Sequence, residues 1–336
     1  MTYSLTWKAC RLPLRTPLRT AHGPWAEREG LLVRLEGAAG RVGYGEVAPI
    51  PWFGTETVAE AVEALGRRGD RVGAAELEAV PANLGCVRFA LACARAEADG
   101  PLAAEAGPGR RLPVAALLPA GRDALGRLEA GLAAGYLAFK WKVGVQRPEE
   151  EWGLLDDLLA RLPRYATLRL DANGAWERRA AEGWLARCAE RPVEFVEQPV
   201  APAQVDLLLG LAADYRVTLA LDEAVTGLAA AQAWWERGWR GVYVLKPALA
   251  GPLAEQAAWL RQTGADVVFS SAIETAVGRA AILRWVLANP FSKRALGFGV
   301  GELFGDVRWD GPVMGPLLEA GWAAGVKAEA AWNALP

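Results

Sequence analysis

The stretch VTLALD, residues 217–222, decides the fold, because it is one of a series of short apolar runs that each end on a charged residue. Comparable runs end at Asp171, Glu197 and Lys246, at intervals of about 25 residues. Such an interval accommodates one short strand, one helix and two loops, and the intervening segments carry apolar residues at three- and four-residue spacing. About eight such units predict a barrel of the (β/α)8 type.

The predicted barrel strands share an apolar interior and a polar or glycine-rich boundary. They are Leu112–Leu118, Leu137–Val143, Ala166–Asp171, Val193–Glu197, Val217–Asp222, Gly241–Lys246, Asp266–Ser271 and a weaker run near Leu296–Val300. The alternative is an open doubly wound sheet. It is disfavoured because no glycine-rich phosphate loop follows an early strand.

The first part of the chain has a different pattern. Strand-like runs at Ser4–Arg11, Leu31–Glu36 and Arg41–Glu46 precede helical stretches at Thr57–Arg68 and Pro81–Ala98, which predicts a separate α+β domain. The expected divisions are an α+β domain over 1–107, a barrel over 108–310 and a segment over 311–336 that packs back toward the first domain. The Gly- and Pro-rich stretch 107–113 is expected to link the first two.

Composition excludes several classes of function. Among 336 residues, 37 Lys and Arg nearly balance 39 Asp and Glu, so nothing favours nucleic acid or an anionic membrane as a partner. No stretch predicts a signal peptide or a transmembrane helix. The four cysteines lack metal-site spacing and predict buried thiols in a reducing cytoplasm. A monomer and a homo-oligomer both remain open.

Three of the charged strand ends are carboxylates, Asp171, Glu197 and Asp222. The carboxyl ends of barrel strands meet at one edge, where three carboxylates repel one another unless they bind a cation. Three hard oxygen ligands predict one Mg²⁺ ion, with Mn²⁺ as a substitute. Zinc is disfavoured because no Cys is suitably placed and His22 is the one histidine.

Lysines supply the complementary charge. Lys140 and Lys142 lie two residues apart on a strand and so share one face. Two such charges about 6–7 Å apart can lower a lysine pKa by about two units, which predicts that one lysine acts as a base near neutral pH. Lys246 lies across the barrel mouth, where it can stabilise negative charge or act as a second acid or base.

Three further polar residues flank these positions. Arg169 precedes Asp171 by two residues, and we expect it to pair with the carboxylates or substrate; a structural ion pair is an equally weighted alternative. Asn173 and Glu223 are expected to support the metal ligands from behind.

Together these residues carry a resemblance to a known family. Lys140-x-Lys142, Asp171-Ala172-Asn173-Gly174, Glu197-Gln198-Pro199, Asp222-Glu223 and Lys246-Pro247 resemble, in order and spacing, the enolase superfamily and most closely its muconate-lactonizing subgroup. The resemblance implies a (β/α)7β barrel with an N-terminal α+β capping domain. It also implies magnesium at the three carboxylates and a small carboxylate substrate between Lys142 and Lys246. The mandelate-racemase subgroup is disfavoured because its histidine base has no counterpart.

Within the subgroup the chain is most similar to the o-succinylbenzoate synthase family, on Gly45-Glu46-Val47-Ala48-Pro49 and on Ser270-Ser271-Ala272-Ile273-Glu274-Thr275. That resemblance implies dehydration of 2-succinyl-6-hydroxy-2,4-cyclohexadiene-1-carboxylate to o-succinylbenzoate through an enediolate, in menaquinone or phylloquinone biosynthesis. Ser270 and Ser271 would then bind substrate. Specificity is expected in the loops at 21–29 and 51–57.

Two alternatives remain. A dipeptide epimerase or N-acylamino acid racemase of the same subgroup is expected to carry acids on the eighth strand, whereas LGFGVG at 296–301 has no acid before Glu302. A non-catalytic binding barrel is the remote alternative. It should have lost some of the charged site residues, and this chain has kept them.

Overall fold

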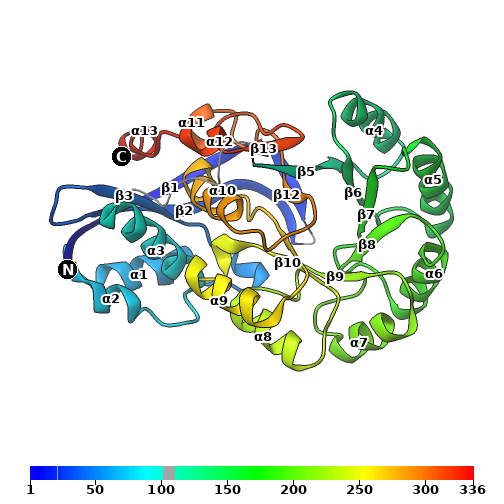
Figure 1. The fold of residues 1–336 in the computed structure, drawn as a ribbon, viewed down its shortest axis with the longest axis horizontal. Helices are drawn as coiled ribbons and strands as arrows, with labels where there is room; N and C mark the ends of the chain where they lie inside the picture. The colour runs from blue at the N-terminus through cyan, green and yellow to red at the C-terminus, as the bar shows by residue number, and fades with distance from the viewer. Residues whose placement is uncertain (21, 101–109) are drawn as a thin grey trace.

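The computed structural model describes residues 1–20, 22–100 and 110–336. Its larger part alternates strands with helices (Figure 1). The strands are β5 (Arg111–Leu118), β6 (Ala138–Lys142), β7 (Thr167–Asp171), β8 (Val193–Glu197), β9 (Leu219–Leu221), β10 (Val242–Leu245), β11 (Val267–Phe269) and β12 (Leu296–Gly299). The helices between them are α4 (Asp123–Ala133), α5 (Pro148–Arg161), α6 (Arg178–Cys188), α7 (Val205–Asp214), α8 (Leu228–Glu236), α9 (Leu253–Thr263) and α10 (Ala276–Ala288).

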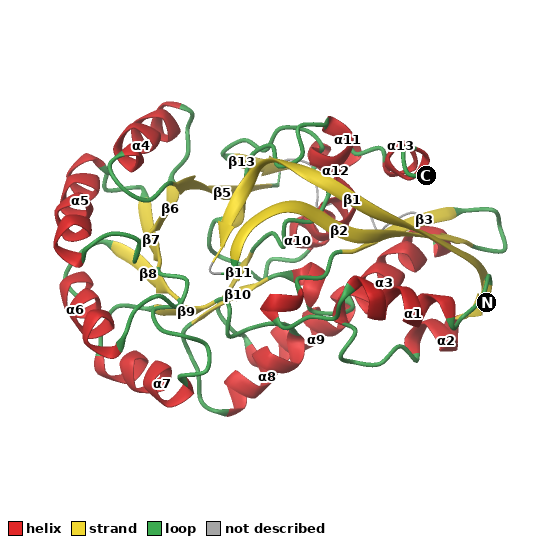
Figure 2. Ribbon diagram, turned by 180° about the vertical axis from the view of Figure 1, so that it is seen from behind, coloured by secondary structure: helices red, strands yellow, loops and turns green. Residues whose placement is uncertain are grey.

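The strands close into a ring. Their order is β11-β10-β9-β8-β7-β6-β5-β12, all neighbours are parallel, and a parallel bridge between Ser270 and Gly297 joins the two ends. Helices α4 to α7 cover the outer rim (Figures 1 and 2). The predicted (β/α)7β barrel is therefore confirmed.

Alternation along β6 points both lysines of this strand inward. Trp141, between Lys140 and Lys142, is fully buried on the outer face, where its ring centroid lies 6.5 Å from that of Trp184 on α6. Trp184 also stacks on Trp176 with centroids 5.0 Å apart. Because successive strand side chains alternate, this tryptophan cluster anchors the orientation of the lysines.

The N-terminal part forms a four-stranded sheet, ordered β3-β2-β1-β4, with three helices on it. Its elements are β1 (Thr2–Thr20), β2 (Gly23–Glu36), β3 (Val42–Val47), the 3₁₀ turn η1 (Pro51–Phe53), α1 (Val58–Gly66), β4 (Arg71–Gly73), α2 (Ala74–Glu78) and α3 (Gly85–Asp99). Helix α3 approaches β3 closely, since a Cβ on Gly45 would lie 2.0 Å from the Ala90 carbonyl oxygen.

The hairpin of β1 and β2 is longer than predicted. The sequence predicted a first strand over Ser4–Arg11, whereas β1 runs to Thr20 although it contains Pro13 and Pro17, and proline normally interrupts a strand. The pairing instead resumes after a register shift between Pro13 and Leu18, so an irregularity accommodates the missing donors.

The C-terminal segment contacts both parts. It contains α11 (Val307–Asp310), β13 (Leu317–Glu319), α12 (Gly321–Ala324) and α13 (Ala328–Asn333). Strand β13 pairs with β5, and Lys8 Nζ of β1 donates to the Leu335 carbonyl at 2.9 Å. The predicted boundary at 107/108 lies outside the described residues, as does part of the predicted linker, so the division into domains stays a prediction.

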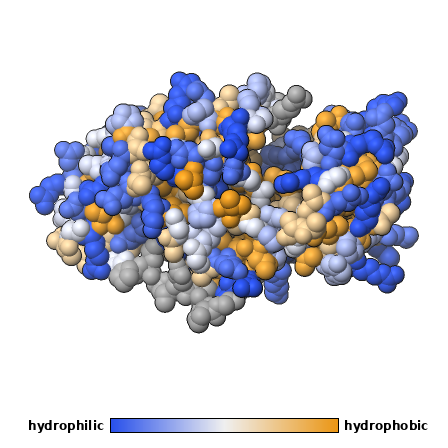
Figure 3. Space-filling model, turned by 90° about the horizontal axis from the view of Figure 1, so that it is seen from above, coloured by the Kyte–Doolittle hydropathy of each residue, from blue (hydrophilic) through white to orange (hydrophobic). Residues whose placement is uncertain are grey.

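The surface carries mixed polarity. Viewed from above, hydrophilic residues are interspersed with hydrophobic ones over the visible face (Figure 3). In the described part of the chain, no helix is long and apolar enough to cross a membrane.

Candidate active site

The three predicted carboxylates lie together at the carboxyl edge of the barrel. Strand register pairs Asp171 directly with Glu197, and Asp222 follows β9 on the next strand of the ring. Their exposed fractions are 6%, 1% and 6%, respectively. Three acids buried on adjacent strands require compensating positive charge.

Two lysines supply charge in this structure. Lys140 Nζ lies 2.8 Å from Asp171 Oδ2 and 2.9 Å from Glu197 Oε1. The Lys246 ammonium pairs with Asp222 and also lies 4.3 Å from the ring centroid of Phe53, on η1 of the N-terminal part. A cation over an aromatic face is attracted by it, so Phe53 stabilises the position of Lys246.

One ammonium cannot neutralise two carboxylates. Burial and the negative charge of Asp171 hold the pKa of Glu197 well above its usual range. Burial would also raise the pKa of Asp171, but the Lys140 cation outweighs it, so that pKa is lowered. Burial disfavours the charged form of Lys140, yet Asp171 and Glu197 together raise its pKa well above normal. The cluster therefore retains a deficit of positive charge.

Asn173 contacts both Asp171 and Glu223, and the supporting role of Asn173 and Glu223 stays a prediction. The Asn173 backbone N–H donates to Asp171 Oδ1 at 3.1 Å, and its side chain donates to Glu223 at 3.1 Å. Burial first, then the charge of Asp222, raises the pKa of Glu223 to about 7.

Sequence reasoning quoted Gln198 within a motif but gave it no role. This fully buried side chain accepts hydrogen bonds from the backbone N–H groups of Asp222 and Ala224, both at 3.1 Å. The backbone of Gln198 has a φ of +37°, a strained value for a non-glycine residue. Its place directly after Glu197 was the available signal. Gln198 fixes the turn that carries the third carboxylate.

Arg169 does not join the cluster. Its Nε donates to Glu194 Oε2 at 2.7 Å, its Nη1 donates to the Ala295 carbonyl at 2.9 Å, and its guanidinium carbon lies 4.9 Å from the Phe195 ring centroid. The expected pairing with the carboxylates is wrong, and the structural alternative holds. Lys140, one strand away, already occupies the space between Asp171 and Glu197.

The two serines after β11 differ. Ser270 is half-buried and donates from Oγ to the Gly297 carbonyl at 3.2 Å. Ser271 is buried and its hydroxyl donates to Glu274 at 2.9 Å while accepting from the Ile273 N–H at 3.0 Å. The Ser271 hydroxyl is thus used within its own loop. Substrate contact stays a prediction for both serines.

The chain matches two family models and several characterised proteins. The model described as enolase C-terminal domain-like matches residues 124–313, and the MenC N-terminal domain matches residues 7–98. The o-succinylbenzoate synthase of Thermosynechococcus vestitus is 40% identical over 88% of this chain and 91% of that protein. The chain belongs to the o-succinylbenzoate synthase family of the enolase superfamily.

A second relative and two solved structures are also similar to this chain. The family member from Edwardsiella ictaluri is 33% identical over 82% of this chain and 83% of its own length. The solved o-succinylbenzoate synthase from Thermosynechococcus elongatus, complexed with Mg in its active site, has a TM-score of 0.86 at 37% identity and covers 99% of this chain and 100% of that one. An L-Ala-D/L-Glu epimerase from Bacillus subtilis, with a TM-score of 0.79 at 19% identity over 93% of this chain and 94% of that one, shares the fold alone.

The donor set in this member of the family fits a divalent cation. In residues 1–20, 22–100 and 110–336, no three acid, histidine or cysteine side chains are arranged to hold a metal. In this structure the ammonium groups of Lys140 and Lys246 contact the three carboxylates. Three buried carboxylates with one ammonium shared between two of them match the hard oxygen ligands that Mg²⁺ prefers.

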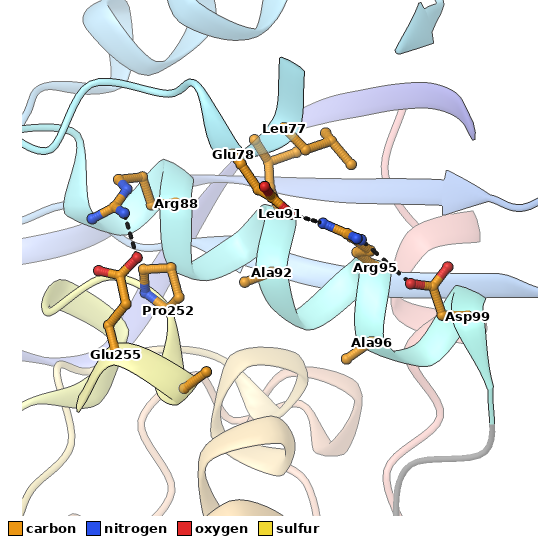
Figure 4. Close-up of a pocket in the computed structure, with 11 residues that line it drawn as sticks. Leu77, Glu78, Arg88, Leu91, Ala92, Arg95, Ala96, Asp99, Pro252 and Glu255 are labelled. Carbon is orange, nitrogen blue, oxygen red and sulfur yellow. Dashed lines mark hydrogen bonds and ion pairs between the residues drawn. The ribbon is translucent and has the colours of Figure 1, made fainter. Parts of the chain in front are cut away.

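A separate groove lies outside this site. It has a volume of about 450 Å³ between α3 and α9 (Figure 4). Its charged side chains pair among themselves, Arg88 with Glu255 and Arg95 with Glu78 and Asp99. No charged group in the groove is left for a ligand, so the barrel mouth is the candidate active site.

Proposed function

We propose that the chain catalyses the magnesium-dependent dehydration of 2-succinyl-6-hydroxy-2,4-cyclohexadiene-1-carboxylate to o-succinylbenzoate, a step of menaquinone or phylloquinone biosynthesis. Membership of the family supports this reaction. The observation that carries the mechanism is the ring position of the lysines. Lys142 stands on β6 and Lys246 follows β10, four strands away in a ring of eight, so they face each other across the carboxylates.

In the proposed reaction Lys142 takes one proton from the substrate and returns the same proton to the leaving group. Its neutral amine removes the proton from the ring carbon that bears the carboxylate. The electron pair left on that carbon then forms the ring double bond as the C–O bond to the hydroxyl group breaks. The Lys142 ammonium returns the proton to the departing hydroxide, which leaves as water. The opposite ammonium of Lys246 stabilises the negative charge that develops between these events.

Asp171, Glu197 and Asp222 would hold the Mg²⁺ ion. When bound, the ion supplies positive charge for the substrate carboxylate, an effect worth several kcal/mol in comparable sites. Lys140 lies two residues before Lys142 on the same face of β6, and its positive charge is expected to tune that base.

The eighth strand favours dehydration over dipeptide epimerisation. Its inward position beside Ser270 is Gly297, and no residue of Leu296–Gly299 is an acid that could bind an ammonium group. Glu302, the first acid after the strand, pairs with Arg15 at an exposed position. Next to this strand, Leu117 aligns with the inward Lys140 and is 39% exposed, which gives the site an apolar wall. Such a wall suits a hydrocarbon ring better than a charged peptide terminus.

The discriminating experiment offers both substrates to the magnesium-loaded chain. The cyclohexadiene acid should be aromatised with a kcat/KM of at least about 10⁴ per molar per second. In heavy water, exchange of the α-protons of L-Ala-Glu and of N-succinyl amino acids should be slower by orders of magnitude. Fast dipeptide epimerisation with negligible aromatisation would contradict the synthase assignment and leave the fold intact.

The cellular setting is part of the proposal. All four cysteines are buried free thiols, which suits a reducing cytoplasm. A monomer and a homo-oligomer are both compatible with a site built from one chain.

A further inference from the structure

The loop between β11 and α10, residues 270–275, has a strained backbone. Ile273 adopts a φ of +60°, which is costly for a β-branched side chain. Such a residue persists only where its surroundings hold it, and strain of this kind gathers at functional sites. The loop begins at Ser270, on the inner edge of the barrel beside Gly297.

A buried arginine of the N-terminal part, here called the capping domain, holds this loop from outside the barrel. Arg28 of β2 is 2% exposed and donates from Nε to the Ile273 carbonyl at 3.0 Å. Its Nη1 donates to the carbonyls of Pro49 at 2.7 Å and Glu29 at 2.9 Å. The guanidinium therefore ties the strained residue to two segments of the capping domain.

A buried carboxylate of the same domain holds the end of the loop. Glu46 of β3 is 2% exposed and accepts from the Thr275 N–H at 2.8 Å, from Thr275 Oγ1 at 2.5 Å and from the Gly278 N–H at 2.9 Å. A Cβ on Gly278 would lie 2.8 Å from Glu46 Oε2, so glycine permits this approach.

The barrel completes the arrangement. Glu274 accepts from Ser271 Oγ at 2.9 Å and from the Ala272 N–H at 2.6 Å, and it pairs with the buried Arg279 at 3.1 Å. Between Ser271 and Thr275 the loop is thus bonded to buried charged side chains, Glu274 of the barrel and Arg28 and Glu46 of the capping domain.

We propose that Arg28 and Glu46 are positioning residues that set the affinity for substrate by holding the Ser270–Thr275 loop in its strained conformation. This inference rests on the proposed function, in which the loop faces the substrate. The capping domain then acts on the barrel through two buried side chains as well as through its aromatic residue Phe53. Misplacing a substrate-binding loop by about 1 Å can cost up to about 100-fold.

The test compares Glu46→Gln and Arg28→Lys with a matched control. Glu97 of α3 accepts from Arg284 of α10 at 2.9 Å, so Glu97→Gln breaks an ion pair across the same interface without touching the loop. In the magnesium-loaded chain, Glu46→Gln and Arg28→Lys should raise KM by about 10-fold to 100-fold with kcat changed less than about three-fold. Glu97→Gln should lower Tm and leave KM unchanged.

Two smaller substitutions test the same inference if the Glu46 and Arg28 variants do not fold. Thr275→Val removes the hydroxyl that donates to Glu46 and should raise KM, whereas Thr275→Ser should restore the parent value. The dissociation constant of o-succinylbenzoate should follow KM in all variants. A lowered Tm with unchanged KM in the Glu46 and Arg28 variants, or an equal rise of KM in Glu97→Gln, would overturn the inference. An inactive parent chain would instead overturn the proposed function.

Discussion

At the scale of single residues, the two lysines of β6 have different surroundings. Lys140 is bonded to Asp171 and Glu197, whereas Lys142 aligns with Asp171 at the end of the strand. The proposed function therefore assigns the proton exchange with substrate to Lys142. Lys246 contacts both Asp222 and the Phe53 ring, and the proposed function assigns to it the supply of positive charge.

Lys142→Ala should lower kcat for dehydration by about 10³-fold or more, because no other group there can take and return the proton. Lys246→Arg should retain part of the activity, since charge suffices at that position, but lose any racemisation. Steady-state kinetics with Lys293→Ala, an exposed lysine, as control would check this. Equal losses in Lys142→Ala and Lys246→Arg would contradict the division of roles.

At the scale of elements, an ion-pair network ties the strands beneath the site. Glu194 at the start of β8 binds Arg169 of β7 and Arg294 before β12, each at 2.7 Å. Burial alone would raise the pKa of Glu194, but the two arginines lower it below its ordinary value of 4.5. A lowered folded pKa adds stability that is present above 4.5 and is lost as the pH falls through the folded pKa.

Glu194→Gln should therefore cost about 3 kcal/mol of unfolding free energy at pH 7, because it leaves the buried Arg169 unpaired. The difference from the parent should shrink once the pH falls below about 4, where the parent carboxylate protonates. Urea unfolding of the parent and the variant at pH 7 and below about pH 4 measures this difference in unfolding free energy. Glu182→Gln, in an exposed pair on α6, is the control and should cost less than about 1 kcal/mol. A cost that is independent of pH would rule out the network.

At the scale of the whole molecule, the carboxylates should couple metal binding to stability. Mg²⁺ at about 100 times its dissociation constant should add about 2.7 kcal/mol, seen as a rise in Tm. Asp222→Ala should fold, lose that rise and lose turnover, while Asp214→Ala, an exposed acid at the end of α7, should keep both. Full activity in EDTA-treated protein would mean that the metal assignment is wrong.

The sequence by itself determined the barrel strands and the charges at their ends. Apolar runs and alternation depend on neighbours along the chain, so they located β5 to β12 and placed Lys140, Asp171, Glu197 and Asp222 on one edge before any contact was known. The resemblance then implied the capping domain and the chemistry of the family.

Only the tertiary structure decided which partner each inward charge meets. Side chains alternate along a strand, so Arg169 and Asp171 lie on the same face. The contact of Arg169 with Glu194 depends instead on how neighbouring strands pack around a closed ring. The bonds of Arg28 and Glu46 to the loop at 270–275 join residues more than 200 positions apart. Local patterns carry no information about such pairs, because the partner is chosen by how whole elements pack and not by spacing along the chain.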